Sequence, residues 1–179
     1  DKEKGRRRGH DGAREEVDDI YVARAIGFIE ENEMNHQDKP FFVYLPLNAI
    51  HAAVTAPQRF KGKSKLSGRE NKILWVNESV GKMLAALDRL KLTDDTLIIF
   101  TTDNGPINSA TARKKGHEPT GPYRGLKTPV WDGGTRVPFA ARWPGHIPVG
   151  VTTDHLIGLT AILATIAAGI GSPPPDGAG

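Results

Sequence analysis

The sequence predicts an α/β fold with a mostly parallel central sheet flanked by helices. Three short apolar runs, rich in β-branched and aromatic residues, indicate strands at 41–45, 97–100 and 137–143. Between them, segments 15–31 and 73–91 carry apolar residues at helical spacing. Helices that alternate with apolar strands are typical of βαβ units, which build parallel sheets.

Each predicted helix has its own apolar pattern. In 15–31, Val22, Ile26 and Ile29 fall on one face, and acidic residues at the start suit the helix dipole. In 73–91 the apolar face runs from Ile73 through Val76, Val80 and Leu84 to Leu87. Segment 154–168 predicts a third, mostly buried helix.

Polar side chains follow the central apolar run at the point where Gly105-Pro106 must turn the chain. Asp103 and Asn104 stand there side by side. In open α/β sheets, ligands bind beyond the carboxyl ends of the strands, and carboxylate and amide oxygens are the ligands that Ca²⁺ and Mg²⁺ prefer. The pair therefore predicts a metal site, and the alternative is an Asp-Asn-Gly turn with nothing bound.

Two further candidates lie in loops. His51 follows the apolar run 41–45 and predicts a proton donor or an anion ligand, with a purely structural histidine as the alternative. Lys127 lies in a loop shaped by glycines and prolines, where it offers a charge for an anion, supported by Arg124 or Arg136. The alternative is that these cations pair with local acids such as Asp132.

Composition limits the function classes. The 179 residues include 25% charged residues and 38% hydrophobic ones, which suits a globular domain. The net charge is +3, and residues 1–14 form a basic, glycine-rich opening that predicts a flexible loop. No aromatic residue lies among these charges, which argues against nucleic-acid binding. Cysteine is absent, and the longest apolar stretch, 157–170, is too short to span a bilayer.

Several segments together resemble one family. They are Pro40 to Leu45 with Asn48 to His51, then Thr96 to Gly105, then Tyr123 to Lys127 with Trp131 to Gly134 and Arg136 to Pro138. In this order they resemble the type I sulfatases, arylsulfatase-like enzymes of the alkaline phosphatase superfamily. The resemblance implies that 15–179 is part of a sulfatase catalytic domain, with an incomplete alkaline phosphatase-like fold.

The resemblance assigns a role to each candidate residue. Asp103 and Asn104 match two metal ligands, for Ca²⁺ or alternatively Mg²⁺. Lys127 matches the lysine that contacts the sulfate, and His51 matches the histidine that hydrogen-bonds the sulfate ester. The implied activity is hydrolysis of a sulfated small molecule or glycan, and the implied compartment is periplasmic or secreted. The resemblance says nothing of oligomeric state.

The sequence also departs from the family pattern. The family nucleophile is a formylglycine formed within Cys/Ser-x-Pro-x-Arg, and the chain has neither version of that motif. Thr55-Ala-Pro-Gln-Arg59 has the spacing but begins with Thr, and Asp18-Asp19 begins a predicted helix rather than matching the family's N-terminal metal ligands. Ala161 replaces an Asp that many relatives have. We therefore expect the chain to lack the nucleophile segment and to have little activity alone.

Two other functions remain open at this stage. A phosphonate or phosphodiester hydrolase of the same superfamily would use the same metal and cations. A non-catalytic sulfatase-like domain would only bind sulfated or other anionic polymers.

Overall fold

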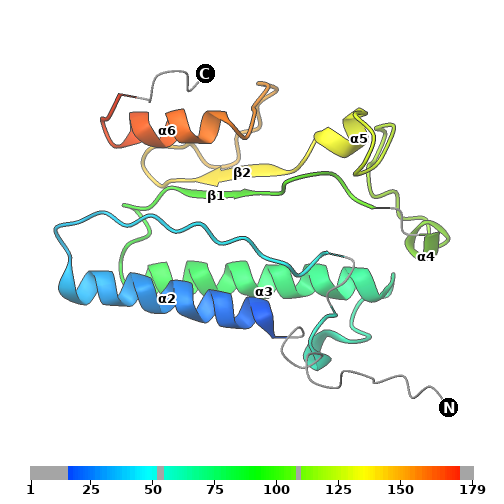
Figure 1. Ribbon diagram of the computed structural model, residues 1–179, viewed down its shortest axis with the longest axis horizontal. Coiled ribbons are helices and arrows are strands. Elements are labelled where there is room, and N and C mark those ends of the chain that lie inside the picture. The colour runs from blue at the N-terminus through cyan, green and yellow to red at the C-terminus, as the bar shows by residue number, and fades with distance from the viewer. Residues whose placement is uncertain (1–15, 52–54, 108–109, 174–179) are drawn as a thin grey trace, which may run out of the picture. The chain divides into compact units, whose positions relative to one another are not determined.

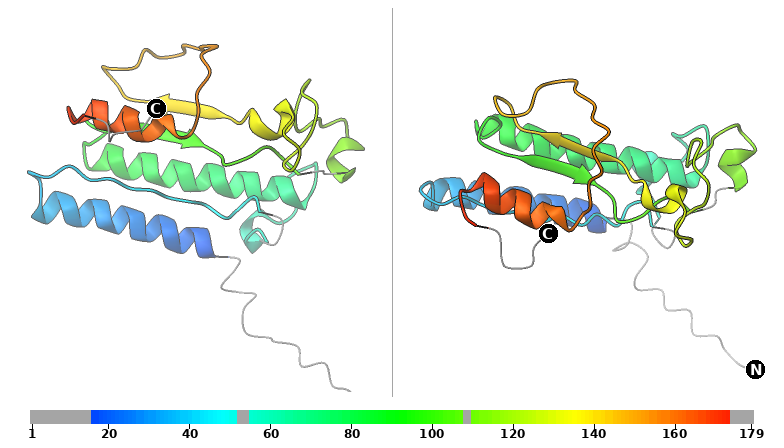
Figure 2. Two further views of the ribbon diagram at one scale, coloured as in Figure 1. Left: turned by 45° about the horizontal axis from the view of Figure 1, so that its top comes forward. Right: turned by 90° about the horizontal axis from the view of Figure 1, so that it is seen from above.

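Two long helices, α2 (Val17–Asn35) and α3 (Gly68–Arg89), form one layer of the computed structural model, which describes residues 16–51, 55–107 and 110–173 (Figure 1). They lie side by side, and the segment that follows α2, up to residue 51, returns along it (Figure 2). Both helices were predicted from their apolar spacing, and both predictions are confirmed. Ser67 caps α3, since its hydroxyl accepts a hydrogen bond from the backbone N–H of Arg69.

The buried core lies where α3 meets the loop before it. Trp75 is fully buried and packs with Ala49, Ala56 and Phe60, the last from the short 3-10 helix η1 (Gln58–Phe60). On α2, Val22 and Ile29 are buried, as the sequence predicts. On α3 Leu87 is buried as predicted, but the predicted face is partly wrong, because Ile73 is half exposed while Trp75, which lies outside that face, is fully buried.

The described sheet has two strands, β1 (Ile98–Thr101) and β2 (Phe139–Arg142), and it is antiparallel. Ile98 pairs with Arg142 and Thr101 with Phe139. β2 lies within the predicted run 137–143, and β1 coincides with most of the run 97–100 and extends one residue beyond it. A mostly parallel sheet is not found in the described ranges. In its described residues the connection from β1 to β2 carries two one-turn helices, α4 (Ala110–Arg113) and α5 (Asp132–Thr135), whereas parallel strands are usually joined by a longer crossover helix.

The predicted strand at 41–45 is not a strand in the structure. Its burial still alternates, since Phe41, Val43 and Leu45 are half-buried while Phe42 and Tyr44 are 69% and 79% exposed. That period of two is typical of extended chain. A strand also needs a hydrogen-bonded neighbour, and no such partner for this segment is present in the described part of the chain.

The chain divides into two compact units, 1–147 and 148–179. The second contains α6 (Ala161–Gly169), which begins later than the predicted helix at 154–168 and is mostly exposed, with only Ala167 buried among its described residues. The opening 1–14, predicted as a flexible basic loop, lies outside the described residues. In the ranges that the structure covers, no helix is both long and apolar enough to cross a bilayer.

Candidate functional site

The predicted metal ligands lie directly beyond the carboxyl end of β1. Thr101 is the last residue of that strand, and the chain bends at Asp103 and Asn104. The Thr102 hydroxyl lies 3.4 Å from Asp103 Oδ1 and 3.4 Å from the Asn104 carbonyl oxygen, so it links the two residues. Asp103 is exposed and Asn104 half-buried, which leaves the carboxylate accessible to a cation.

A close approach of backbones joins this turn to the loop that carries Lys127. The N–H of Gly105 donates to the carbonyl of Gly134 over 2.8 Å, and the N–H of Lys127 donates to the carbonyl of Pro106 over 2.9 Å. A Cβ atom on Gly105 would lie 2.1 Å from the Gly133 carbonyl oxygen, and one on Gly134 would lie 2.2 Å from that of Leu126. Only glycine fits at these contacts, because backbone stands where a side chain would begin. We call Gly105, Gly133 and Gly134 the glycine junction.

The Lys127 loop is cationic, and its arginines contact aromatic rings. The Arg124 guanidinium lies 3.9 Å from the centre of the Trp131 ring, and that of Arg136 lies 4.9 Å from the Tyr123 ring. Arg136 also pairs with Asp132 at 3.2 Å. Lys127 is exposed and forms no ion pair with the described residues, so the alternative in which Asp132 neutralises it is not observed there. Its charge is available to an anion.

His51 lies in a turn that is held by buried groups. Its N–H donates to the Asn48 carbonyl over 2.9 Å, and its carbonyl accepts from Lys72 Nζ over 2.7 Å. The Asn48 N–H donates to Asp18 Oδ1 over 2.9 Å. Arg69, one turn before Lys72 on α3, donates to the Ile107 carbonyl over 2.9 Å. The first turn of α3 therefore contacts both the His51 turn and the segment after Asn104.

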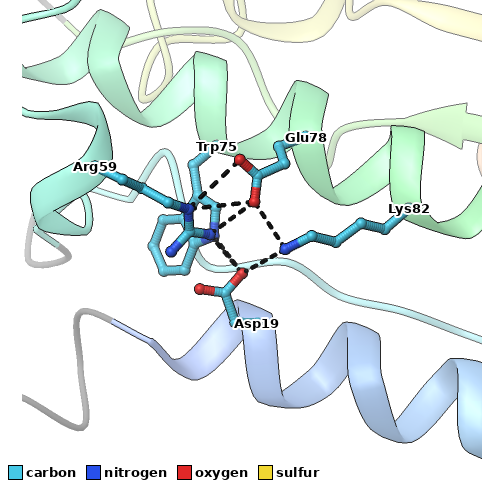
Figure 3. A network of polar contacts seen from close by, with 5 residues as sticks. All are labelled: Asp19, Arg59, Trp75, Glu78 and Lys82. Carbon is cyan, nitrogen blue, oxygen red and sulfur yellow. Dashed lines mark hydrogen bonds and ion pairs between the residues drawn. The ribbon is translucent and has the colours of Figure 1, made fainter.

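Arg59, the last residue of the motif-like Thr55 to Arg59, belongs to a network of charges (Figure 3). Its guanidinium pairs with Asp19 at 2.7 Å and with Glu78 at 2.9 Å, and Lys82 pairs with Glu78 at 2.7 Å. The Trp75 indole N–H donates to Asp19 Oδ1 over 3.3 Å. The network joins α2, η1 and α3, so the role of Arg59 in this structure is to link these elements.

The charged groups of the network shift one another's pKa values. Burial raises the pKa of Asp19, but hydrogen bonds from Arg59 and Trp75 outweigh it, so the net pKa is lowered. The pKa of Glu78 is also lowered, mainly by the hydrogen bond from Lys82. With Asp19 in these ion pairs and Asp18 bonded to Asn48, neither carboxylate of the Asp18-Asp19 pair is placed as an open metal ligand.

The described residues contain no group of three or more His, Cys, Asp or Glu side chains that would hold a metal. Asp103 and Asn104 offer two oxygen atoms at this turn, whereas a bound Ca²⁺ ion takes six to eight, so these two residues alone would not complete its shell. One hollow of the first unit lies elsewhere, between α2 and the segment after it. It is lined by Tyr21, Arg24, Ala25, Phe28 and residues 42–46 and 48. Among the described residues, direct hydrogen bonds thus link the Lys127 loop to the Asp103 turn, and α3 links the His51 turn to the segment after Asn104.

Comparison with known proteins decides the family. The family model named Sulfatase matches residues 2–172. The chain belongs to the sulfatase family. This confirms the resemblance that the motifs around His51, Asp103 and Lys127 indicate, but it does not test the role of any single residue.

Curated sulfatases match most of the chain. It is 36% identical over 170 residues to the N-acetylgalactosamine-6-O-sulfatase of Bacteroides thetaiotaomicron, covering 92% of this chain and 32% of that relative. It is 33% identical to human N-acetylgalactosamine-6-sulfatase and 35% identical to human arylsulfatase A, covering 88% and 86% of this chain and 29% and 30% of those relatives. The sulfatase chain thus spans about a third of the length of the curated relatives it matches.

Solved structures share the fold of this sulfatase chain. One, from work on glycosaminoglycan metabolism by Bacteroides thetaiotaomicron, has a TM-score of 0.81 at 36% identity, covering 91% of this chain and 34% of the other. Another, Ps i-CgsB in complex with k-i-k-neocarrahexaose, has a TM-score of 0.76 at 28% identity, covering 90% and 36%. The expected sulfatase fold class is therefore confirmed at the level of the family.

Sequence reasoning missed the residues that hold the site together. Asp18, Arg69 and Lys72 carry no motif, and their partners lie 30, 38 and 21 residues away. The glycines of the junction were visible in the sequence as Gly105 and Gly133-Gly134, as parts of a turn and of the family-like motifs, but not as contacting residues. Their close approach to one another is a property of the packed chain.

Proposed function

We propose that the protein is a sulfate ester hydrolase to which this chain contributes metal ligands, an anion-binding lysine and a leaving-group acid. The observation that carries the proposal is the glycine junction. Through the Gly105–Gly134 and Lys127–Pro106 hydrogen bonds it holds the Asp103 turn against the Lys127 loop. The oxygen ligands proposed for the metal and the lysine proposed for the anion therefore come from adjoining segments of backbone. Binding of a metal-bound anionic ester requires both.

The donor set fits a hard divalent cation. Asp103 offers a carboxylate and Asn104 an amide oxygen, and the exposed Asp103 carries no ion pair with the described residues. We propose Ca²⁺ as the metal, with Mg²⁺ as the alternative. When bound, the metal would supply positive charge that stabilises the negative oxygens of the ester group.

Lys127 and His51 have distinct proposed roles. The Lys127 ammonium, exposed in its loop, would bind a sulfate oxygen and neutralise part of its charge. Hydrolysis breaks the S–O bond and releases an alcohol, whose oxygen must gain a proton as it leaves. We assign that proton transfer to the imidazole of His51, because a histidine ring donates and accepts protons near neutral pH. None of the four residues His51, Asp103, Asn104 and Lys127 is proposed as the nucleophile.

The proposed substrate is a sulfated glycan. Three of the relatives named above are sulfatases whose names specify N-acetylgalactosamine 6-sulfate or an aryl sulfate, and a structural neighbour binds an oligosaccharide. The partly exposed rings of Tyr123 and Trp131, each four residues from Lys127 in the sequence, are of the kind on which sugar rings pack, and a guanidinium already lies over each of them.

The test uses the full-length protein with 4-nitrocatechol sulfate and, in parallel, 4-nitrophenyl phosphate. We expect turnover of the sulfate ester, and a loss of about 10²-fold or more in kcat/KM for Asp103→Ala and Lys127→Met. Asp95→Ala and Lys114→Met are matched controls, because both residues are exposed and carry the same charges elsewhere in the same unit. Full activity of Asp103→Ala, or faster turnover of the phosphate ester, would contradict the proposal.

A further inference from the structure

The turn that carries His51 is fixed at both ends by charged groups that are buried. At its start, Asp18 Oδ1 accepts the Asn48 N–H over 2.9 Å and lies 3.4 Å from Asn48 Nδ2. At its end, Lys72 Nζ donates to the His51 carbonyl over 2.7 Å. Asp18 is 0% exposed and Lys72 is 6% exposed. Two helices therefore each supply one charged group to a turn of four residues.

These charges are costly for the fold. Burial lowers the pKa of Lys72, and the neighbouring charge of Arg69 lowers it further, which means that its ammonium form is disfavoured here. Asp18 Oδ2 is buried and makes no hydrogen bond within the described residues. A buried polar atom without a partner destabilises the folded state. Asp18 and Lys72 are therefore costly groups to bury, and their bonds go to the backbone of the His51 turn.

The same end of α3 also contacts the segment after the predicted metal ligands. Arg69 and Lys72 are one helical turn apart, and Arg69 donates to the Ile107 carbonyl over 2.9 Å. Residues separated by three positions lie on one face of a helix. One helix face thus contacts the backbone of both loops, which are 56 residues apart at His51 and Ile107.

We propose that Asp18 and Lys72 are positioning residues of the reaction, which fix the His51 turn relative to the Asp103 turn so that His51 meets the leaving oxygen. This rests on the proposed function, in which His51 protonates that oxygen. Neither residue touches the substrate. Proton transfer depends on distances held within a few tenths of an ångström, so a turn that is free to drift loses rate without losing binding.

The readout is the dependence of kcat on the leaving group. A poor leaving group needs the proton, whereas a good one departs with little help. In the full-length protein we expect Lys72→Met and Asp18→Ala to lower kcat on N-acetylgalactosamine 6-sulfate by about tenfold or more, and on 4-nitrophenyl sulfate much less, with KM little changed. Lys72→Arg and Asp18→Asn keep a donor and an acceptor, so they should restore most of the rate.

Lys82→Met is the matched control. Lys82 is also a lysine of α3 and pairs with Glu78 and Asp19, and within the described residues its ion pairs and hydrogen bonds reach neither loop. Its loss should change stability and leave the ratio of the two kcat values unchanged. Equal losses on both substrates in Lys72→Met, or a control that moves the ratio as far, would overturn the inference.

Hydrogen exchange separates this inference from the proposed function. We expect faster exchange at the amides of residues 48–51 in Asp18→Ala and Lys72→Met than in the wild type or Lys82→Met. Unchanged exchange refutes positioning, whatever the activity. Faster exchange in a protein that hydrolyses no sulfate ester refutes the proposed reaction, and with it the catalytic purpose of the positioning, while it confirms that the two residues hold the turn.

Discussion

Replacing Gly105 by alanine tests whether the glycine junction sets the geometry of the site. The new Cβ would lie 2.1 Å from the Gly133 carbonyl oxygen and 2.8 Å from Gly134 Cα. Both glycines are buried, and the atoms in the way are backbone, which has no rotamer through which to escape. Gly105 is not among the glycines with positive φ, so the substitution acts through this contact and not through backbone strain.

The size of the effect follows from these distances. Ordinary contact begins near 3.4 Å, so a Cβ at 2.1 Å requires the two backbones to separate by about 1 Å. That movement breaks the 2.8 Å hydrogen bond from the Gly105 N–H to the Gly134 carbonyl. Overpacking of this kind costs about 1–3 kcal/mol of unfolding free energy. A displacement of about 1 Å between groups that act on one substrate lowers the rate by about 10²-fold.

The assay measures kcat on 4-nitrocatechol sulfate and the affinity for Ca²⁺ by calorimetry, with denaturant unfolding of the same preparations. Gly81→Ala is the control, because no atom lies within 4 Å of its Cβ position on α3. That variant should be more stable by about 0.5–1 kcal/mol and fully active. A Gly105→Ala protein with wild-type kcat and Ca²⁺ affinity would refute the reasoning, since the two loops would then function without their close approach.

Two further predictions concern the charge network around Arg59 and the buried side chain of Trp75. The pKa values of Asp19 and Glu78 are lowered in the folded state, so their contribution to stability is present above the unfolded values and is lost as the pH falls through the folded ones. The unfolding free energy should therefore decrease when the pH drops below about 4, and it should decrease less in Arg59→Met. Urea titrations from pH 7 to about pH 2.5 measure it. An equal decrease in Arg59→Met would contradict this prediction. Trp75 is fully buried, so Trp75→Ala should lower the unfolding free energy by about 3–5 kcal/mol, and Trp75→Phe should lower it less. Phe42 is 69% exposed, so Phe42→Ala should change it by under about 0.5 kcal/mol. Thermal or urea unfolding measures both.

The local elements of the fold were predictable from the sequence. Apolar spacing placed α2 and α3, and the β-branched run at 97–100 placed β1, because each pattern is set by residues close together in the chain. The segment 41–45 shows the limit of such patterns. Its alternation is that of a strand, but whether a strand forms depends on a neighbour that its own residues do not specify.

The direction of the sheet shows the same limit. Helices alternating with apolar runs predicted parallel strands, yet β2 pairs antiparallel to β1. The described helices between these strands have four residues each, whereas the crossover between parallel strands is usually a longer helix. No periodic spacing of apolar residues indicated how long the helices in this loop would be, because the segment from 108 to 136 is dominated by glycine, proline and polar residues.

The sequence by itself determined the family, the two long helices, the two strands and the identity of His51, Asp103, Asn104 and Lys127 as candidates, because motifs and periodicity are properties of neighbouring residues. Only the tertiary structure decided that Gly105 meets Gly134 and that Lys72 and Asp18 hold the His51 turn. These contacts join residues 21 to 30 positions apart, and they depend on backbone approach and on burial. A single sequence records neither, because both arise only when the chain packs against itself.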